Sequence, residues 1–107
     1  MAHHASTEIG RLGEAIAERY LRLAGYRIIE RNLRLSRLEI DLVAEHGDQI
    51  CFVEVRLRRR SRFGGAAETI GHRKRQHLRS AARHYLQSRP VARCRFDVIA
   101  IEERDEH

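Results

Sequence analysis

Two carboxylates and an arginine in neighbouring apolar runs are the residues of this sequence best suited to chemistry: Asp41, Glu54 and Arg56. Paired carboxylates suit Mg²⁺ or Mn²⁺, because a hard divalent cation takes one or two carboxylates and completes its shell with waters and phosphate oxygens. A metal held there could activate a water, while Arg56 donates hydrogen bonds to the phosphoryl oxygens. The three residues therefore predict a metal-dependent phosphodiester hydrolase in which all three are catalytic.

These side chains share a surface only if the two runs form a hairpin in a particular register. Gly47-Asp48 lies between the runs, and such a pair predicts a two-residue turn. With the turn centred there, Asp41 faces Glu54 across the strands, and Glu39 faces Arg56. Like charges in direct opposition are destabilising, so the first pairing is unexpected without a metal. The alternative is a solvated hairpin face on which Glu39 and Arg56 form an ordinary ion pair.

Apolar periodicity places this hairpin inside an α/β domain. The hairpin face expected to be buried carries Ile40, Leu42, Cys51, Val53 and Val55. The pattern predicts a helix, three strands, a helix and a strand, with bounds near 7–24, 26–33, 38–44, 49–57, 70–88 and 95–102. This αβββαβ order indicates one mixed sheet flanked by helices, in a single domain over 7–103. Residues 1–6 are interpreted as the remainder of an expression tag or a disordered end.

Each helix is expected to bury one apolar stripe. In the first helix, which Thr7 would cap and Gly25 would end, the stripe is Ile9, Leu12, Ile16, Tyr20 and Leu23. In the second helix it is Leu78, Ala81, Ala82, Tyr85 and Leu86. Cys51 and Cys94 have no metal-ligand spacing, so both are interpreted as reduced core or near-core residues of a cytoplasmic protein.

The charge balance favours a polyanionic partner. The 107 residues include 21 Lys and Arg against 15 Asp and Glu, a net charge of +6, and Lys74 is the only lysine. A genome rich in arginine codons would explain the excess of arginine but not its clustering. No apolar run has the length of a membrane span. The residues expected to bind nucleic acid, and DNA in particular, are Arg58, Arg59, Arg60, Arg62, Arg73 and Lys74.

Blocks of residues spread in order over 9–101 resemble the YraN family. They are Gly10-Arg11-Leu12-Gly13-Glu14, Ala17, Tyr20-Leu21, Gly25-Tyr26, Arg31-Asn32, Glu39-Ile40-Asp41-Leu42, Phe52-Val53-Glu54-Val55, Phe63-Gly64, Lys74 and Arg95-Phe96-Asp97-Val98. That family is similar to restriction-endonuclease-like, PD-(D/E)xK nucleases, especially archaeal Holliday-junction resolvases. The resemblance implies a restriction-endonuclease-like fold and activity on DNA, including branched DNA, and the resolvase analogy suggests a homodimer.

The resemblance also implies roles for individual residues. Glu14, Asp41 and Glu54 match the acids that bind Mg²⁺ or Mn²⁺. Lys74 matches the basic residue that opens the second helix, and Arg56 occupies the position of the usual lysine.

Two departures from the family pattern put catalysis in question. Arg56 keeps the positive charge of the usual lysine but cannot act as a base at neutral pH. Leu38 replaces a usual glycine and is expected to crowd the approach to Asp41. The rival interpretations are a non-catalytic nucleic-acid-binding module and an interaction or scaffold protein.

Overall fold

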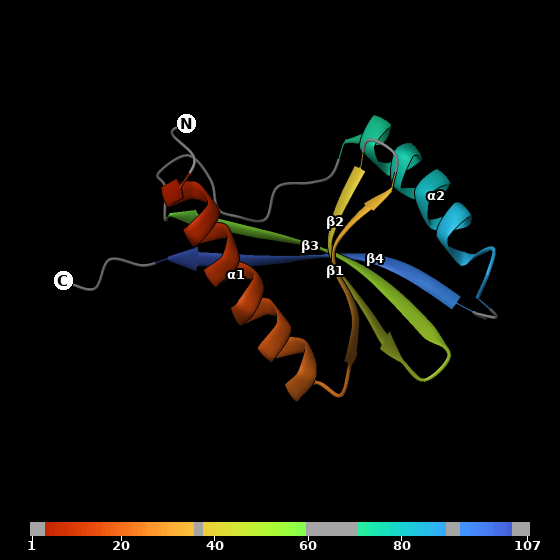
Figure 1. Ribbon diagram of the computed structural model, residues 1–107, viewed down its shortest axis with the longest axis horizontal. Coiled ribbons are helices and arrows are strands. Elements are labelled where there is room, and N and C mark those ends of the chain that lie inside the picture. Colours follow the sequence, from red (N-terminus) through yellow and green to blue (C-terminus); the bar gives the residue numbers. More distant parts are fainter. Residues whose placement is uncertain (1–3, 36–37, 60–70, 90–92, 104–107) are drawn as a thin grey trace.

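The fold has the predicted order of helices and strands. A computed structural model describes residues 4–35, 38–59, 71–89 and 93–103 (Figure 1). The elements are α1 (His4–Leu23), β1 (Arg27–Leu35), β2 (Leu38–His46), β3 (Gln49–Arg59), α2 (His72–Leu86) and β4 (Arg93–Glu103). Except at the start of α1, the described ends agree with the prediction to within about two residues, which is the usual uncertainty of such bounds. The α/β class and the αβββαβ order are confirmed.

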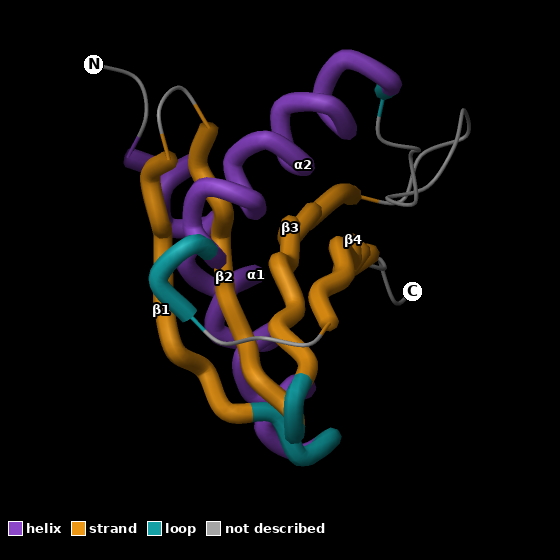
Figure 2. Tube along the Cα trace, turned by 90° about the vertical axis from the view of Figure 1, so that its right-hand side faces the viewer, coloured by secondary structure: helices purple, strands orange, loops and turns teal. Residues whose placement is uncertain are grey.

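The strands form one mixed sheet with a helix on each face. Its order is β1-β2-β3-β4; the first three strands run antiparallel, and β4 runs parallel to β3. A parallel pair needs a crossover connection, which α2 supplies. Buried residues of α1 pack against one side of β2 and β3, and those of α2 pack against the other, which gives three layers (Figures 1 and 2).

The predicted register of the β2–β3 hairpin is confirmed. The strands pair from His46↔Gln49 to Leu42↔Val53, and Gly47 has a φ of 61°, which suits glycine at the first position of a tight turn. The backbone pairing ends at Leu42↔Val53, one step before Asp41 and Glu54 would face each other. The two acidic residues therefore lie where β2 and β3 begin to part.

The prediction of one buried hairpin face is incomplete. Leu42, Cys51 and Val53 pack under α1 as expected, with Val55 partly buried beside them. The opposite face is buried too, because α2 covers the cluster of Ile40, Val43, Ile50 and Phe52. Ile40 was wrongly assigned to the α1 side: strict alternation fails once β2 is no longer held in the pleat of β3. Central strands of a three-layer domain are buried on both faces.

The packing face of α1 differs from the predicted one. Its buried residues are small ones and a leucine, namely Gly13, Ala17 and Leu21, whereas the apolar stripe is largely exposed, at 60% for Leu12, 45% for Ile16, 63% for Tyr20 and 80% for Leu23. The helix lies so close to β3 that a Cβ on Gly13 would stand 3.4 Å from the Cβ of Leu57. Small residues permit this approach, so they face the sheet and the larger side chains lie to the side.

The predicted start of α1 was wrong, and its predicted end is confirmed. The helix begins at His4, so Thr7 lies inside it and is not its N-cap, and residues 4–6 are helical. The C-terminal prediction is confirmed, because Gly25 has a φ of 93° and its N–H donates to the Arg22 carbonyl. The Tyr26 N–H donates to the Leu21 carbonyl at 2.9 Å, which completes a Schellman motif.

The second helix buries the stripe predicted for it. Leu78, Ala81 and Ala82 are buried, and Tyr85 and Leu86 are partly buried. Of the two free cysteines, Cys51 is buried as expected, but Cys94 is exposed near the start of the edge strand. Within the described ranges, no helix has the length and apolarity to cross a membrane.

Candidate active site

Asp41 lies in the fork between β2 and β3. Its Oδ2 accepts a hydrogen bond from the Val55 backbone N–H at 2.7 Å, at the point where pairing with β2 has stopped. Burial raises the pKa of Asp41, the Val55 hydrogen bond opposes that rise, and the negative charges of Glu54 and Glu39 add to it. The protein therefore holds an acid whose ionised form is electrostatically unfavourable, as is common in functional sites.

Glu54 is flanked by two cationic side chains. The Lys74 ammonium of α2 is 2.6 Å from Oε1, and the Arg56 Nη2 is 3.8 Å from Oε2. The second distance is too long for a hydrogen bond. Oε2 is buried and, within the described part of the chain, has no hydrogen-bond partner. A buried carboxylate oxygen without a hydrogen bond is uncommon in folded proteins.

The other residues discussed for the site are Arg56, Glu39 and Leu38, and they differ in how they lie relative to Glu54. Arg56 is close to Glu54 as expected, and its side chain is only 13% exposed. Glu39 has an ion pair with Arg34 at 3.6 Å. Leu38 packs with the α2-side cluster and lines a hollow with His77 and other residues, separate from the hollow that Glu54 and Lys74 line.

Glu14 approaches the fork from α1. Burial raises its pKa, as do the negative charges of Asp41 and Glu39, while a hydrogen bond with the Asn32 side chain opposes the rise. Asn32 has a φ of 51°, a left-handed conformation that asparagine tolerates better than most residues. Asn32 was not predicted as a site residue, although it belongs to the Arg31-Asn32 block of the family resemblance.

Comparison with known proteins identifies the family. The family model described as "Uncharacterised protein family UPF0102" matches residues 13–101. The chain belongs to the UPF0102 family. Relatives named "UPF0102 protein" are 47% identical in Hahella chejuensis, over 88% of this chain and 77% of the relative, and 49% identical in Methylobacillus flagellatus, over 92% and 87%. Another, from Moorella thermoacetica, is 49% identical over 86% of this chain and 78% of the relative. The predicted YraN-like membership is confirmed.

The predicted metal ligands Glu14, Asp41 and Glu54 remain a prediction. No group of three or more His, Cys, Asp or Glu side chains is arranged to hold a metal ion among the residues that the structure describes. Asp41 and Glu54 interact electrostatically, and the buried Oε2 of Glu54 is a ready acceptor for a cation. Two carboxylates fit Mg²⁺ or Mn²⁺, which retain several waters or phosphate oxygens as ligands.

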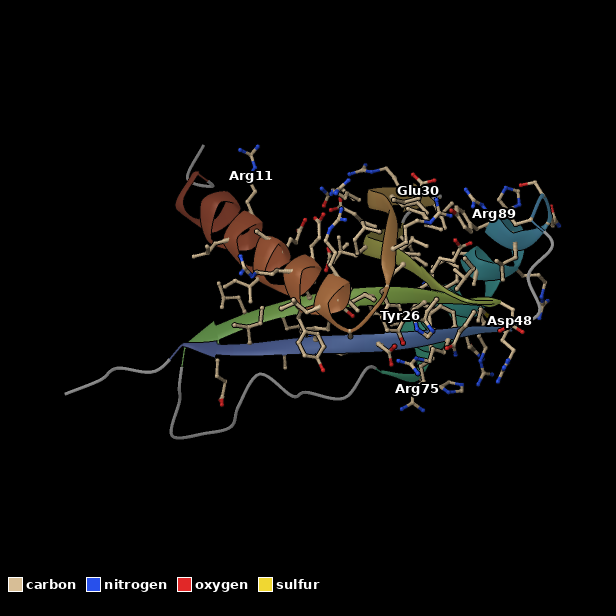
Figure 3. The ribbon with its side chains drawn as sticks, turned by 90° about the horizontal axis from the view of Figure 1, so that it is seen from below. Arg11, Tyr26, Glu30, Asp48, Arg75 and Arg89 are labelled. Atoms are coloured by element: carbon tan, nitrogen blue, oxygen red, sulfur yellow. The ribbon has the colours of Figure 1, made fainter. Side chains whose placement is uncertain are left out.

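The predicted nucleic-acid contacts are only partly described by the structure. Arg60 and Arg62 lie outside the described residues, as do the side chains of Arg58 and Arg59. At the start of α2, Arg73 is exposed and Lys74 contacts Glu54. Arg75, which was not predicted as a contact, projects from α2 into solvent (Figure 3).

Proposed function

We propose that this UPF0102 protein is a metal-dependent phosphodiester hydrolase that acts on DNA. The observation that carries the proposal is the buried Oε2 of Glu54, which accepts no hydrogen bond from the described residues and lies beside Asp41, an acid whose pKa is raised. Concentrated negative charge without full internal compensation is expected where a divalent cation binds. The net charge of +6 supports a polyanionic substrate. The resemblance to resolvase-like nucleases supports DNA, including branched DNA.

Each residue of the site has a proposed task. Asp41 and Glu54 would hold Mg²⁺ or Mn²⁺, which when bound supplies an activated water and neutralises charge on the phosphate. Lys74 orients Glu54 through Oε1. Arg56 donates to phosphate oxygens and cannot accept a proton, so it stabilises charge rather than acting as a base. Glu14 lies close enough to Asp41 for the two carboxyl groups to interact, so its carboxylate would add to the local field for a cation.

Mn²⁺ binding tests the proposal directly. Titration followed by the electron paramagnetic resonance signal of free Mn²⁺ is expected to show one bound ion in the wild type. Glu54→Gln removes an anionic ligand and is expected to weaken binding by at least tenfold, because ligand charge dominates hard-cation affinity. Glu45→Gln is the matched control, because Glu45 is on β2 but pairs with Arg27 at the far end of the strand. Equal Mn²⁺ binding by the wild type and Glu54→Gln would remove the metal from this site.

A second candidate function is a DNA-binding module without catalysis. The observation in its favour is that Lys74 and Arg56 both approach Glu54, at 2.6 Å and 3.8 Å, so internal cations can partly replace a metal. This alternative predicts DNA binding with no Mn²⁺ requirement. Wild type that binds DNA but no Mn²⁺ would favour it.

Both candidates predict a strongly salt-dependent affinity for DNA. Each phosphate neutralised contributes about −0.9 to the slope of log affinity against log salt for duplex DNA. Replacing Arg58, Arg59 and Arg60 by alanine is expected to flatten that slope by up to about three such contributions and to weaken binding to all sequences alike. Fluorescence anisotropy at several salt concentrations measures this. An unchanged slope in the triple variant would exclude these arginines from the interface.

A further inference from the structure

The strand β4 forms one edge of the sheet. It is 11 residues long and carries the uncharged segment Val98–Ile101 (Figure 2). One side of an edge strand presents unpaired N–H and C=O groups, which can pair with another strand. Natural edge strands are commonly protected by charges, bulges or irregular backbone.

The other edge of the sheet is protected in that way. β1 carries charged residues throughout, namely Arg27, Glu30, Arg31 and Arg34. Its pairing with β2 shifts register between Ile28 and Glu30, and Asn32 has a positive φ. Such features discourage a further strand from adding at β1. β4 is charged as well, but its pairing with β3 runs without a register shift, which makes β4 the edge better suited to pairing.

The exposed stripe of α1 lies on the same side as the β4 edge. A groove between α1 and β4 is lined by Ile16, Tyr20 and Leu21 of the helix and by Val98, Ile99 and Ile101 of the strand. Glu14 and Glu18 lie on the other flank of α1, where they contact Asn32 and Arg31 of β1. Ile16 and Tyr20 therefore face β4 across the groove, and they remain 45% and 63% exposed. Exposed apolar patches of this kind mark interaction sites.

We propose that a second copy of this chain binds here, through antiparallel pairing of β4 with its own copy. A two-fold axis perpendicular to the sheet would join the two sheets edge to edge and keep both α1 helices on the same face. The α1 stripes of the two copies would then face each other across the joined β4 strands. The 11-residue strand is about 36 Å long, enough to contribute to a standard interface of roughly 800 Å² per partner.

The charge pattern of β4 favours its own copy over an unrelated strand. The strand begins with Arg93, carries the Arg95–Asp97 ion pair before the uncharged segment, and ends with Glu102 and Glu103. With full overlap of the two strands, antiparallel self-pairing places Arg93 of each copy opposite Glu103 of the other, twice per dimer. Opposite charges across strands stabilise pairing, and like charges oppose it. Parallel pairing would instead align like with like.

The first test is oligomeric mass. Sedimentation equilibrium of the full chain at increasing concentration is expected to give twice the 12.5 kDa mass of one chain. Tyr20→Glu, which places a charge in the groove at a 63% exposed position, is expected to return the mass to that of one chain. Ala15→Glu adds the same charge at another exposed position of α1 outside the groove, and it is expected to remain dimeric. A monomeric wild type overturns the proposal.

A cross-link tests the strand pairing separately. Full overlap of the strands places Val98 opposite its own copy, with Cβ atoms about 5 Å apart, within reach of a disulfide. Val98→Cys in a Cys94→Ser background is expected to form a covalent dimer on mild oxidation. Wild-type Cys94 is not expected to cross-link with itself, because the register separates the two copies by about 26 Å along the strands. A dimer that Tyr20→Glu leaves intact, or one without the Val98→Cys cross-link, contradicts this interface.

Discussion

Arg56→Lys is expected to raise Mg²⁺-dependent cleavage of DNA by on the order of 10²–10³, the usual effect of one well-placed transition-state donor. A lysine ammonium is compact, whereas a guanidinium is broad and keeps its proton at all relevant pH values. Arg56 is close to Glu54 and mostly buried, so its bulk is placed to displace the water that a bound metal would activate. The wild type is therefore expected to cleave poorly, and single-turnover cleavage of duplex and branched substrates measures the gain.

Three variants make the Arg56 result interpretable. Arg93→Lys is the same chemical change at an exposed position of β4, and it is expected to leave cleavage unchanged. Asp41→Asn in the Arg56→Lys background is expected to abolish cleavage, because the metal loses an anionic ligand. Leu38 lines a different hollow from Glu54, so we expect the single Arg56→Lys change to suffice. The nuclease proposal fails if Leu38→Gly with Arg56→Lys folds, binds DNA and still cleaves nothing.

Asp41→Asn is expected to stabilise the metal-free protein at neutral pH. An amide oxygen can still accept the Val55 hydrogen bond, while the partly buried charge and its repulsion with Glu54 disappear. Cross-strand charge effects are up to about 1 kcal/mol, which raises the melting temperature by roughly 4 °C or more in a domain of this size. Thermal unfolding in the presence of a chelator measures the shift.

The pH dependence of that shift distinguishes its cause. The folded-state pKa of Asp41 is raised above its ordinary value of 3.8, so its contribution to stability is fully present below 3.8 and is lost as pH rises through the folded pKa. The advantage of Asp41→Asn should therefore be largest near neutral pH and vanish toward pH 3.8. Asp48→Asn at the exposed hairpin turn removes one charge without burial and should show no such trend. Asp41→Asn that is less stable than wild type at pH 7 would contradict the electrostatic assignment.

The hairpin was predictable because its information is local. Gly47-Asp48 set the turn and the register, and the register brought Asp41 and Glu54 to the same end of β2 and β3. Gly25 ended α1 for a similarly local reason, since its positive φ suits glycine. The family resemblance agreed with this order and contributed Glu14, which no local pattern singled out.

The packing of α1 could not be predicted from periodicity. The hydrophobic stripe Leu12, Ile16, Tyr20 and Leu23 was the stronger signal, yet Gly13 and Ala17 face the sheet. Periodicity identifies an apolar face but not what covers it, and close helix–sheet approach favours small residues. Ile40 was misassigned because the alternation along β2 breaks between Ile40 and Leu42, where the pairing of β2 with β3 ends.

The sequence by itself determined the α/β class, the order of the elements, the hairpin register and the basic character of the chain, because turns, periodicity and charge are properties of neighbouring residues. Only the tertiary structure decided that Lys74 meets Glu54, that Asp41 contacts the Val55 backbone, and that Asn32 meets Glu14. These contacts join residues far apart in the chain, and they depend on where β2 and β3 part and how each helix crosses the sheet. Spacing along a sequence carries no direct record of that geometry.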